Sequence, residues 1–227
     1  NAVQGDSRVI KTAATLSKLG YRIHLFGMSK TDHNETLPGY PFSIELAKNP
    51  SHQMKAEGLW FDGQKRRNNS LFINQLAQNI AELIGKQHFD VLHTHDMYGL
   101  PVGAILKDLV FKPNIVWVHD VHEFVEGCTN IDEHVRTVMW QLEQEHIRQP
   151  DALTTVSPIL SQILTNQYGV GKVGLVMNTP RLADFDPWYP VPIRKALNLD
   201  KKIPLMVYIG NAKPERGVHL GVEALAY

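Results

Sequence analysis

A short apolar run that leads straight into titratable side chains constrains the fold of this chain more than any other stretch. Residues 115–118 read Ile-Val-Trp-Val, and His119, Asp120, His122 and Glu123 follow directly. An apolar run of this length between helical patterns is typical of a strand buried on both faces of a parallel sheet. Ligands of open α/β sheets bind outside the carboxyl ends of the strands. The sequence therefore predicts a functional site at the end of this strand.

Strands and helices alternate along most of the chain. The helical segments carry apolar residues at spacings of three and four, as residues 71–84 do before Gly85 ends that helix. Short apolar segments lie between the helices, at residues 21–27, 89–93, 115–118, 152–156 and 173–177. Because crossovers between parallel strands are right-handed, this order predicts an α/β fold with a doubly wound, parallel, Rossmann-like sheet.

The first predicted helix precedes the first predicted strand. We therefore expect the first strand of the sheet to be missing from this chain. Gly5, Asp6 and Ser7 would then form the loop between that strand and the helix, where backbone N–H groups and the helix dipole favour an anion or a hydroxyl group. The alternative is that Asp6 or Ser7 only caps the helix.

The composition of the chain changes after residue 180. Three prolines, with Trp188 and Tyr189 among them, are typical of a connecting segment. We predict an N-terminal domain over residues 1–180, a linker over 181–203, and the first βα unit of a truncated second domain over 204–227. The strand of that unit is expected at residues 205–209, and a single βα unit cannot bury both of its faces.

Charge and cysteine content exclude several classes of protein. The chain of 227 residues has 23 Lys and Arg against 23 Asp and Glu, so we expect no nucleic-acid partner. The single cysteine, Cys128, excludes an internal disulfide and fits a reducing, cytoplasmic compartment. No apolar run approaches the roughly 20 residues that span a bilayer.

Polar clusters follow two neighbouring predicted strands. One is His93-Thr94-His95-Asp96, and the other is His119-Asp120-Val121-His122-Glu123. Paired histidines at strand ends are typical of metal-dependent hydrolases, because both imidazoles can project to one side. Against that alternative, no later His or Asp constellation is placed to complete a bridging metal site.

The other interpretation places one histidine beside a sugar carbon, where it accepts or donates a hydrogen bond as charge develops. Such groups typically contribute about 10²–10⁴-fold to a rate. A histidine at a strand end can also simply cap a helix or bond nearby backbone. We favour this structural role for His93, which lies deeper in its strand than His95.

The order of several segments resembles glycosyltransferase family 4, whose members have the GT-B fold with two Rossmann-like domains. The matching segments are spread over nearly the whole chain; they are residues 6–9, 19–23, 89–96, 120–124, 150–157, 176–180, 208–210 and 215–217. The resemblance implies a retaining glycosyltransferase, hexosyl- or related, that uses a nucleotide-sugar donor. It also implies a glycan, lipid or small-molecule acceptor, and neither a cofactor nor an obligatory metal.

The resemblance also implies roles for individual residues. His122 matches the histidine that contacts the transferred sugar and is the expected catalytic residue. The residues expected to bind substrate around it are Gly5, Asp6, Arg8, His95, Asp96 and Glu123. Gly210, Asn211 and Arg216 are expected to hold the donor diphosphate, and the fork of an arginine suits phosphate oxygens. Asn211 departs from the arginine frequent in the family, which puts one phosphate contact in doubt.

The paired glutamates and the ribose and base contacts of the family lie further along its second domain. We therefore expect residues 1–227 to form no complete donor site and to be inactive by themselves. The alternative function is a non-catalytic binding or assembly module of the same fold. The expected location is the cytoplasm, and a lipid acceptor would bring the enzyme to the cytoplasmic face of a membrane as a peripheral protein.

Overall fold

A computed structural model gives the fold and describes residues 3, 6–58, 65–111, 115–129, 131–179, 193–210, 212 and 214–226. The chain divides into two compact units, Asn1–Asn178 and Thr179–Tyr227, which are described separately below. The predicted linker over 181–203 lies outside the described residues as far as residue 192, so its role stays a prediction.

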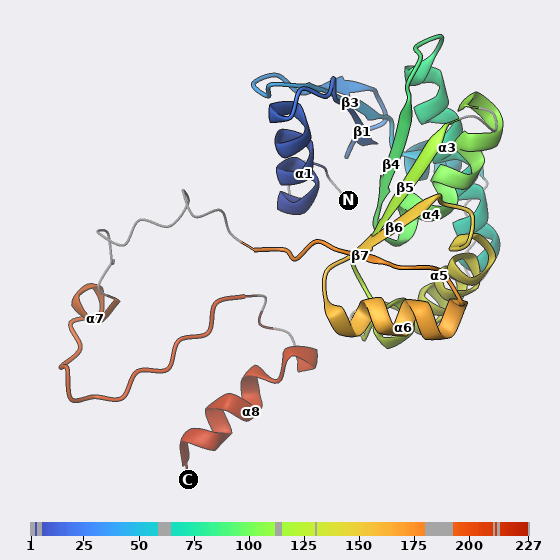
Figure 1. Ribbon diagram of the computed structural model, residues 1–227. Coiled ribbons are helices and arrows are strands. Elements are labelled where there is room, and N and C mark those ends of the chain that lie inside the picture. The colour runs from blue at the N-terminus through green and yellow to red at the C-terminus, as the bar shows by residue number, and fades with distance from the viewer. Residues whose placement is uncertain are drawn as a thin grey trace. The chain divides into compact units, whose positions relative to one another are not determined.

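The first unit contains two sheets (Figure 1). The first sheet has the order β1-β3-β2, with β1 (His24–Met28) parallel to β3 (Ser43–Ala47) and β2 (Glu35–Thr36) antiparallel to β3. The second sheet is parallel throughout and has the order β4-β5-β6-β7. Its strands are β4 (Val91–His95), β5 (Val116–Val121), β6 (Ala152–Thr155) and β7 (Gly174–Leu175). A strand ahead of β1 stays a prediction.

Six α-helices alternate with these strands: α1 (Ser7–Lys18), α2 (Pro50–Ala56), α3 (Lys65–Ile84), α4 (Asp96–Leu106), α5 (Glu133–His146) and α6 (Pro158–Tyr168). A π-helical turn (Lys107–Phe111) extends α4, and a 3-10 turn (Val125–Gly127) precedes α5. Local sequence fixes their ends. The hydroxyl of Ser157 accepts from the Leu160 N–H at the start of α6, Pro158 follows it, and Gly169 ends the helix in the left-handed region.

Helices α3, α4 and α5 gather along one face of the second sheet (Figure 1). The indole of Trp117 in β5 is fully buried on this face. It packs with Leu100 and Ala104 of α4 and with Leu160 and Leu164 of α6. The neighbouring Val116 is 49% exposed, so the prediction that this strand is buried on both faces is wrong at its beginning. The strand becomes fully buried only towards its carboxyl end, where Asp120 and Val121 lie.

Strand register places the carboxyl ends of the second sheet level with one another. His95 of β4 is paired with Asp120 of β5, and Asp120 is paired with Thr154 of β6. Residues that are partners across neighbouring parallel strands point to the same face of the sheet. β4 ends two residues later than predicted, so that both His93 and His95 belong to the strand and share a face.

The second unit contains α7 (Ile193–Ala196), a 3-10 turn (Pro214–Arg216), α8 (Val218–Glu223) and a further 3-10 turn (Ala224–Ala226). Residues 205–209, predicted as a buried strand, form no strand in the described part of this unit, and Ile209 is 90% exposed. A strand needs a neighbouring strand to satisfy its N–H and C=O groups, and residues 193–210 provide none.

We predict that Gly103→Ala destabilises the first unit. A Cβ at Gly103 would lie 2.7 Å from Cζ2 of Trp117 and 2.8 Å from Cγ2 of Thr94. Overpacking of this kind costs about 1–3 kcal/mol and outweighs the gain of roughly 1 kcal/mol from alanine in a helix. Gly99→Ala in the same helix is the control, because its nearest neighbour would be 3.5 Å away. Urea unfolding should rank Gly103→Ala below the unmodified chain and Gly99→Ala at or above it.

Candidate functional site

The carboxylate of Asp120 is the centre of the site at the carboxyl end of β5. Arg8 donates to both of its oxygens, from Nε to Oδ2 at 2.6 Å and from Nη2 to Oδ1 at 2.7 Å. The hydroxyl of Thr154 donates to Oδ1 at 2.6 Å. Both partners of the ion pair are almost completely buried, with side chains 5% and 3% exposed. Burial opposes ionisation of Asp120, but the hydrogen bonds from His122, His95, Arg8 and Thr154 outweigh it and hold its pKa far below the usual range.

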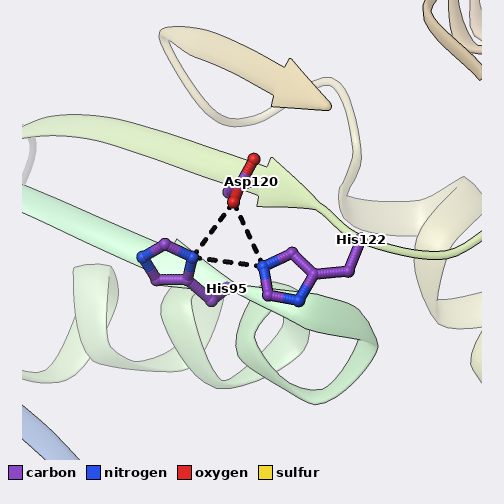
Figure 2. A group of neighbouring side chains, drawn as sticks. All are labelled: His95, Asp120 and His122. Carbon is purple, nitrogen blue, oxygen red and sulfur yellow. Dashed lines mark hydrogen bonds and ion pairs between the residues drawn. The ribbon is translucent and has the colours of Figure 1, made fainter. Parts of the chain in front are cut away.

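Two histidines face the same oxygen of Asp120 (Figure 2). Nδ1 of His95 lies 3.2 Å from Oδ2, and Nε2 of His122 lies 3.1 Å from it. The two ring nitrogens are 3.3 Å apart. Burial lowers the pKa of His122, but the hydrogen bond and the negative charge of Asp120 act in the opposite direction and leave it raised. The structure therefore brings together the two histidines that the sequence singled out.

Helix α1 supplies the arginine because its first turn lies against the end of the second sheet. The carboxylate of Asp6 accepts from the N–H groups of Arg8 and Val9 and so caps α1. Nη1 of Arg8 donates to the carbonyl oxygen of Val176, 2.5 Å away, just beyond β7. The guanidinium thus holds α1, β5 and the segment after β7 together. The predicted substrate-binding role of Arg8 stays a prediction, and Gly5 lies outside the described residues.

A neutral hydrogen-bonded chain lies on the opposite face of β5. Nε1 of Trp117 donates to the hydroxyl of Thr94 at 2.9 Å, and the same hydroxyl is hydrogen-bonded to Nδ1 of His119, 2.8 Å away. Burial, with the nearby His95 second, lowers the pKa of His119 to about 3 and keeps the ring neutral.

His93 stacks on His95 with ring centroids 4.3 Å apart. Its buried Nε2 has no hydrogen-bond partner, so the backbone bond expected of His93 is not formed by that atom. Burial lowers its pKa to about 4, and the ring is neutral at physiological pH. His93 acts here as a packing surface for His95.

Asp96 and Glu123 lie beside this cluster. They line a small cavity together with His119, His122 and Glu143. Asp96 begins α4 with φ 65°, a left-handed conformation that is uncommon for residues other than glycine, and its Oδ1 accepts from the Met97 N–H at 2.8 Å. Glu123 is exposed. Their predicted contacts with substrate stay predictions.

The residues predicted to hold the donor belong to the second unit. Gly210 is exposed, as is Arg216 in the 3-10 turn Pro214–Arg216, and Asn211 lies outside the described residues. Their role as a phosphate site stays a prediction.

The sequence placed Asp120 in the polar cluster at the end of this strand but gave it no role, and it missed Thr154, which lies in a predicted strand. The resemblance placed Arg8 around His122 as a substrate-binding residue. It gave no sign of the ion pair between Arg8 and Asp120, which are 112 residues apart in the sequence.

One group in the described part of the chain has the composition of a metal site. It consists of His95, Asp120 and His122, and the ligand atoms all lie within 4.8 Å of one another. Two imidazole nitrogens and one carboxylate oxygen are a donor set that zinc and other divalent transition metals accept.

We predict strong coupling between Arg8 and Asp120 in folding stability. Removing one member of a buried ion pair typically costs about 3–5 kcal/mol, because the other charge stays buried without a partner. Arg8→Met and Asp120→Asn should each lower the free energy of unfolding by such an amount, and the double variant should lose much less than their sum. Lys18→Met, at an exposed position of α1, is the control. Additive losses in urea unfolding would contradict this prediction.

We also predict a pH dependence that originates at Glu143 of α5. Its Oε1 accepts from the hydroxyl of Tyr168 at 2.5 Å, and burial raises its pKa from 4.5 to about 6. The folded state binds this proton more tightly than the unfolded state, so the stability it contributes is complete below pH 4.5 and is lost as the pH rises through 6. The loss is about 2 kcal/mol.

Glu143→Gln keeps an acceptor for Tyr168 without the buried charge. It should abolish this pH dependence and raise the free energy of unfolding above pH 7 by up to about 2 kcal/mol. Glu145→Gln, at an exposed position of the same helix, should leave the dependence in place. Urea titrations between pH 4 and pH 8 compare the variants, and the same slope in both would overturn the assignment.

Comparison with solved structures confirms the fold. A sucrose-phosphate synthase from Thermosynechococcus elongatus matches with a TM-score of 0.71 at 18% sequence identity, over 95% of this chain and 52% of that chain. A further structure of a sucrose-phosphate synthase from the same organism matches with a TM-score of 0.49 at 16% identity, over 84% of this chain and 91% of that one. This chain therefore spans about half the length of the first of these proteins. The Rossmann-like GT-B fold that the sequence predicted is confirmed.

Comparisons at the level of sequence give the family. No curated protein matches the chain. In the described residues, no helix has both the length and the apolar character needed to cross a membrane. The model of Glycosyltransferase Family 4 matches residues 6–178, a range that contains Arg8, His95, Asp120 and His122. The predicted family is thereby confirmed: the chain belongs to glycosyltransferase family 4.

Proposed function

We propose that this chain is the acceptor-side part of a retaining glycosyltransferase that transfers a hexosyl or related group from a nucleotide-sugar donor. The acceptor is a glycan, a lipid or a small molecule. The observation that carries the proposal is the placement of His122, whose Nε2 is held 3.1 Å from a fixed carboxylate at the carboxyl end of β5. Membership of the family supports the reaction class.

The hydrogen bonds of His122 leave one ring nitrogen for a sugar. Ionised Asp120 only accepts hydrogen bonds, so Nε2 of His122 carries a hydrogen and donates to it. In the described part of the chain no partner engages Nδ1, and the side chain is 11% exposed. In the neutral ring this Nδ1 accepts a hydrogen bond from a sugar hydroxyl and so fixes the position of the sugar. Asp120 places negative charge near the developing positive charge of the sugar carbon.

The donor side of the reaction belongs to the second unit and to chain beyond the part described. We propose that Gly210, Asn211 and Arg216 contact the donor diphosphate once two domains close around it. Transfer needs no obligatory metal in this proposal, because charged side chains neutralise the leaving group. We expect residues 1–227 alone to show no transfer, and a lipid acceptor would be met at the cytoplasmic face of a membrane.

We predict that His122→Ala in the full-length protein lowers turnover about 10²–10⁴-fold, the usual contribution of a positioned hydrogen-bonding group. Folding stability should change little in comparison. Release of nucleoside diphosphate from a panel of UDP-, GDP- and ADP-sugars, each with and without candidate acceptors, measures the turnover. His88→Ala, an exposed position before β4, is the control.

Unchanged turnover in His122→Ala would sink the assignment of this residue. A full-length protein that binds a nucleotide sugar without releasing its nucleotide would support the alternative of a non-catalytic binding module.

A further inference from the structure

We propose that His95, Asp120 and His122 bind a divalent transition metal ion, with zinc the best match, and that sugar transfer does not require this ion. The ligand atoms are Nδ1 of His95, Oδ2 of Asp120 and Nε2 of His122, which converge on one point (Figure 2). The proposal goes beyond the function given above, because it assigns a ligand of a different chemical class to the same residues.

The distances between the three atoms fit one face of a coordination shell. They are 3.1, 3.2 and 3.3 Å. A tetrahedral zinc with bonds of about 2.0–2.1 Å holds neighbouring ligand atoms about 3.3 Å apart. The three atoms therefore already stand at the separation that zinc requires, and binding needs little movement of the strands.

The hydrogen bonds at Asp120 are a second reason to expect a metal ion at these three residues. Oδ1 accepts from Arg8 and Thr154, whereas Oδ2 accepts from Arg8 and faces both imidazole nitrogens. Five donors thus address a carboxylate that offers about four lone-pair positions. A metal ion replaces the two imidazole donors at Oδ2 by one bond, so each lone pair is used once. The imidazole nitrogens then direct their lone pairs at the ion rather than two N–H groups at one oxygen.

The residues around the three proposed ligands hold them in place and also limit their affinity for a metal ion. Arg8 and Thr154 hold the carboxylate from outside, the role that outer hydrogen bonds have at known metal centres. The side chains of His95 and His122 are 15% and 11% exposed, which leaves an approach for the ion and for a water as fourth ligand. The positive charge of Arg8 opposes the ion, while Asp6 and Asp96 contribute negative charge near His122. We therefore expect a dissociation constant in the micromolar range.

Metal binding and sugar binding compete in this arrangement. The ion binds Nε2 of His122 through its lone pair, so the hydrogen of the neutral ring lies on Nδ1, which can then no longer accept a hydrogen bond from the sugar. Zinc should inhibit transfer, and this consequence alone depends on the proposed function.

The test uses the 227-residue chain, stripped of metal with EDTA, and needs no enzymatic activity. Zinc is titrated against a chromophoric chelator, and cobalt is titrated as a spectroscopic probe of four- or five-coordinate geometry. We expect one equivalent of each ion, with the affinity reduced at least about tenfold in His95→Ala and in His122→Ala. His88→Ala should bind like the unmodified chain.

The chain has 11 histidines, so weak surface binding must be separated from this site. Zinc affinity that is the same in the unmodified chain, His95→Ala and His122→Ala would overturn the proposal, as would the lack of binding at 1:1 stoichiometry. Asp120→Asn is a weaker test because Arg8 loses its partner, so the two histidine variants decide the question. Circular dichroism verifies that both are folded.

Discussion

The ion pair between Arg8 and Asp120 is the interaction on which the site depends. Its two charges are buried, and each would be costly without the other. The pair joins α1 to β5, and the further bonds of its members reach β6 through Thr154 and the end of β7 through the carbonyl of Val176. Four parts of the chain therefore meet at one ion pair. His95 and His122 are held by an anion whose own position is fixed from several sides.

Side chains alternate between the two faces of β5, and this alternation separates a neutral hydrogen-bonded group from an ionised one. Trp117 and His119 point to the helical layer, where burial keeps the imidazole neutral and the hydroxyl of Thr94 is hydrogen-bonded to both side chains. Asp120 points to the other face, where it is ionised and paired with Arg8. A shift of one residue in the pairing of β5 with β4 would exchange the two faces of the strand. Asp120 would then point into the helical layer, and His119 would point towards Arg8. The register of this strand is therefore a condition for the site.

The sequence was most informative where local rules apply. The start of α6 follows from local sequence, because Ser157 caps the helix and Pro158 suits its first position. The polar cluster after residue 118 was recognised because it interrupts a buried strand. The exposed Val116 and the missing strand at residues 205–209 were not predictable in this way, because burial and strand pairing depend on what lies beside a segment. The ion pair at Asp120 was not predictable for the same reason: only the family resemblance placed Arg8 near the end of this strand, and it gave no partner for Asp120.

The hydrogen bond from Arg8 to the Val176 carbonyl can form only late in the synthesis of this part of the chain. The two residues are 168 positions apart, and ribosomes add about 5–20 residues per second, so roughly 10–30 s separate their synthesis. During that interval α1 and the first sheet can form their own core from Val3, Ala13, Leu25, Phe42, Ile44 and Leu46. The guanidinium remains in water until β5 and β7 arrive. The hydrogen bonds of Arg8 are thus complete only after Val176 has been synthesised, long after α1 itself.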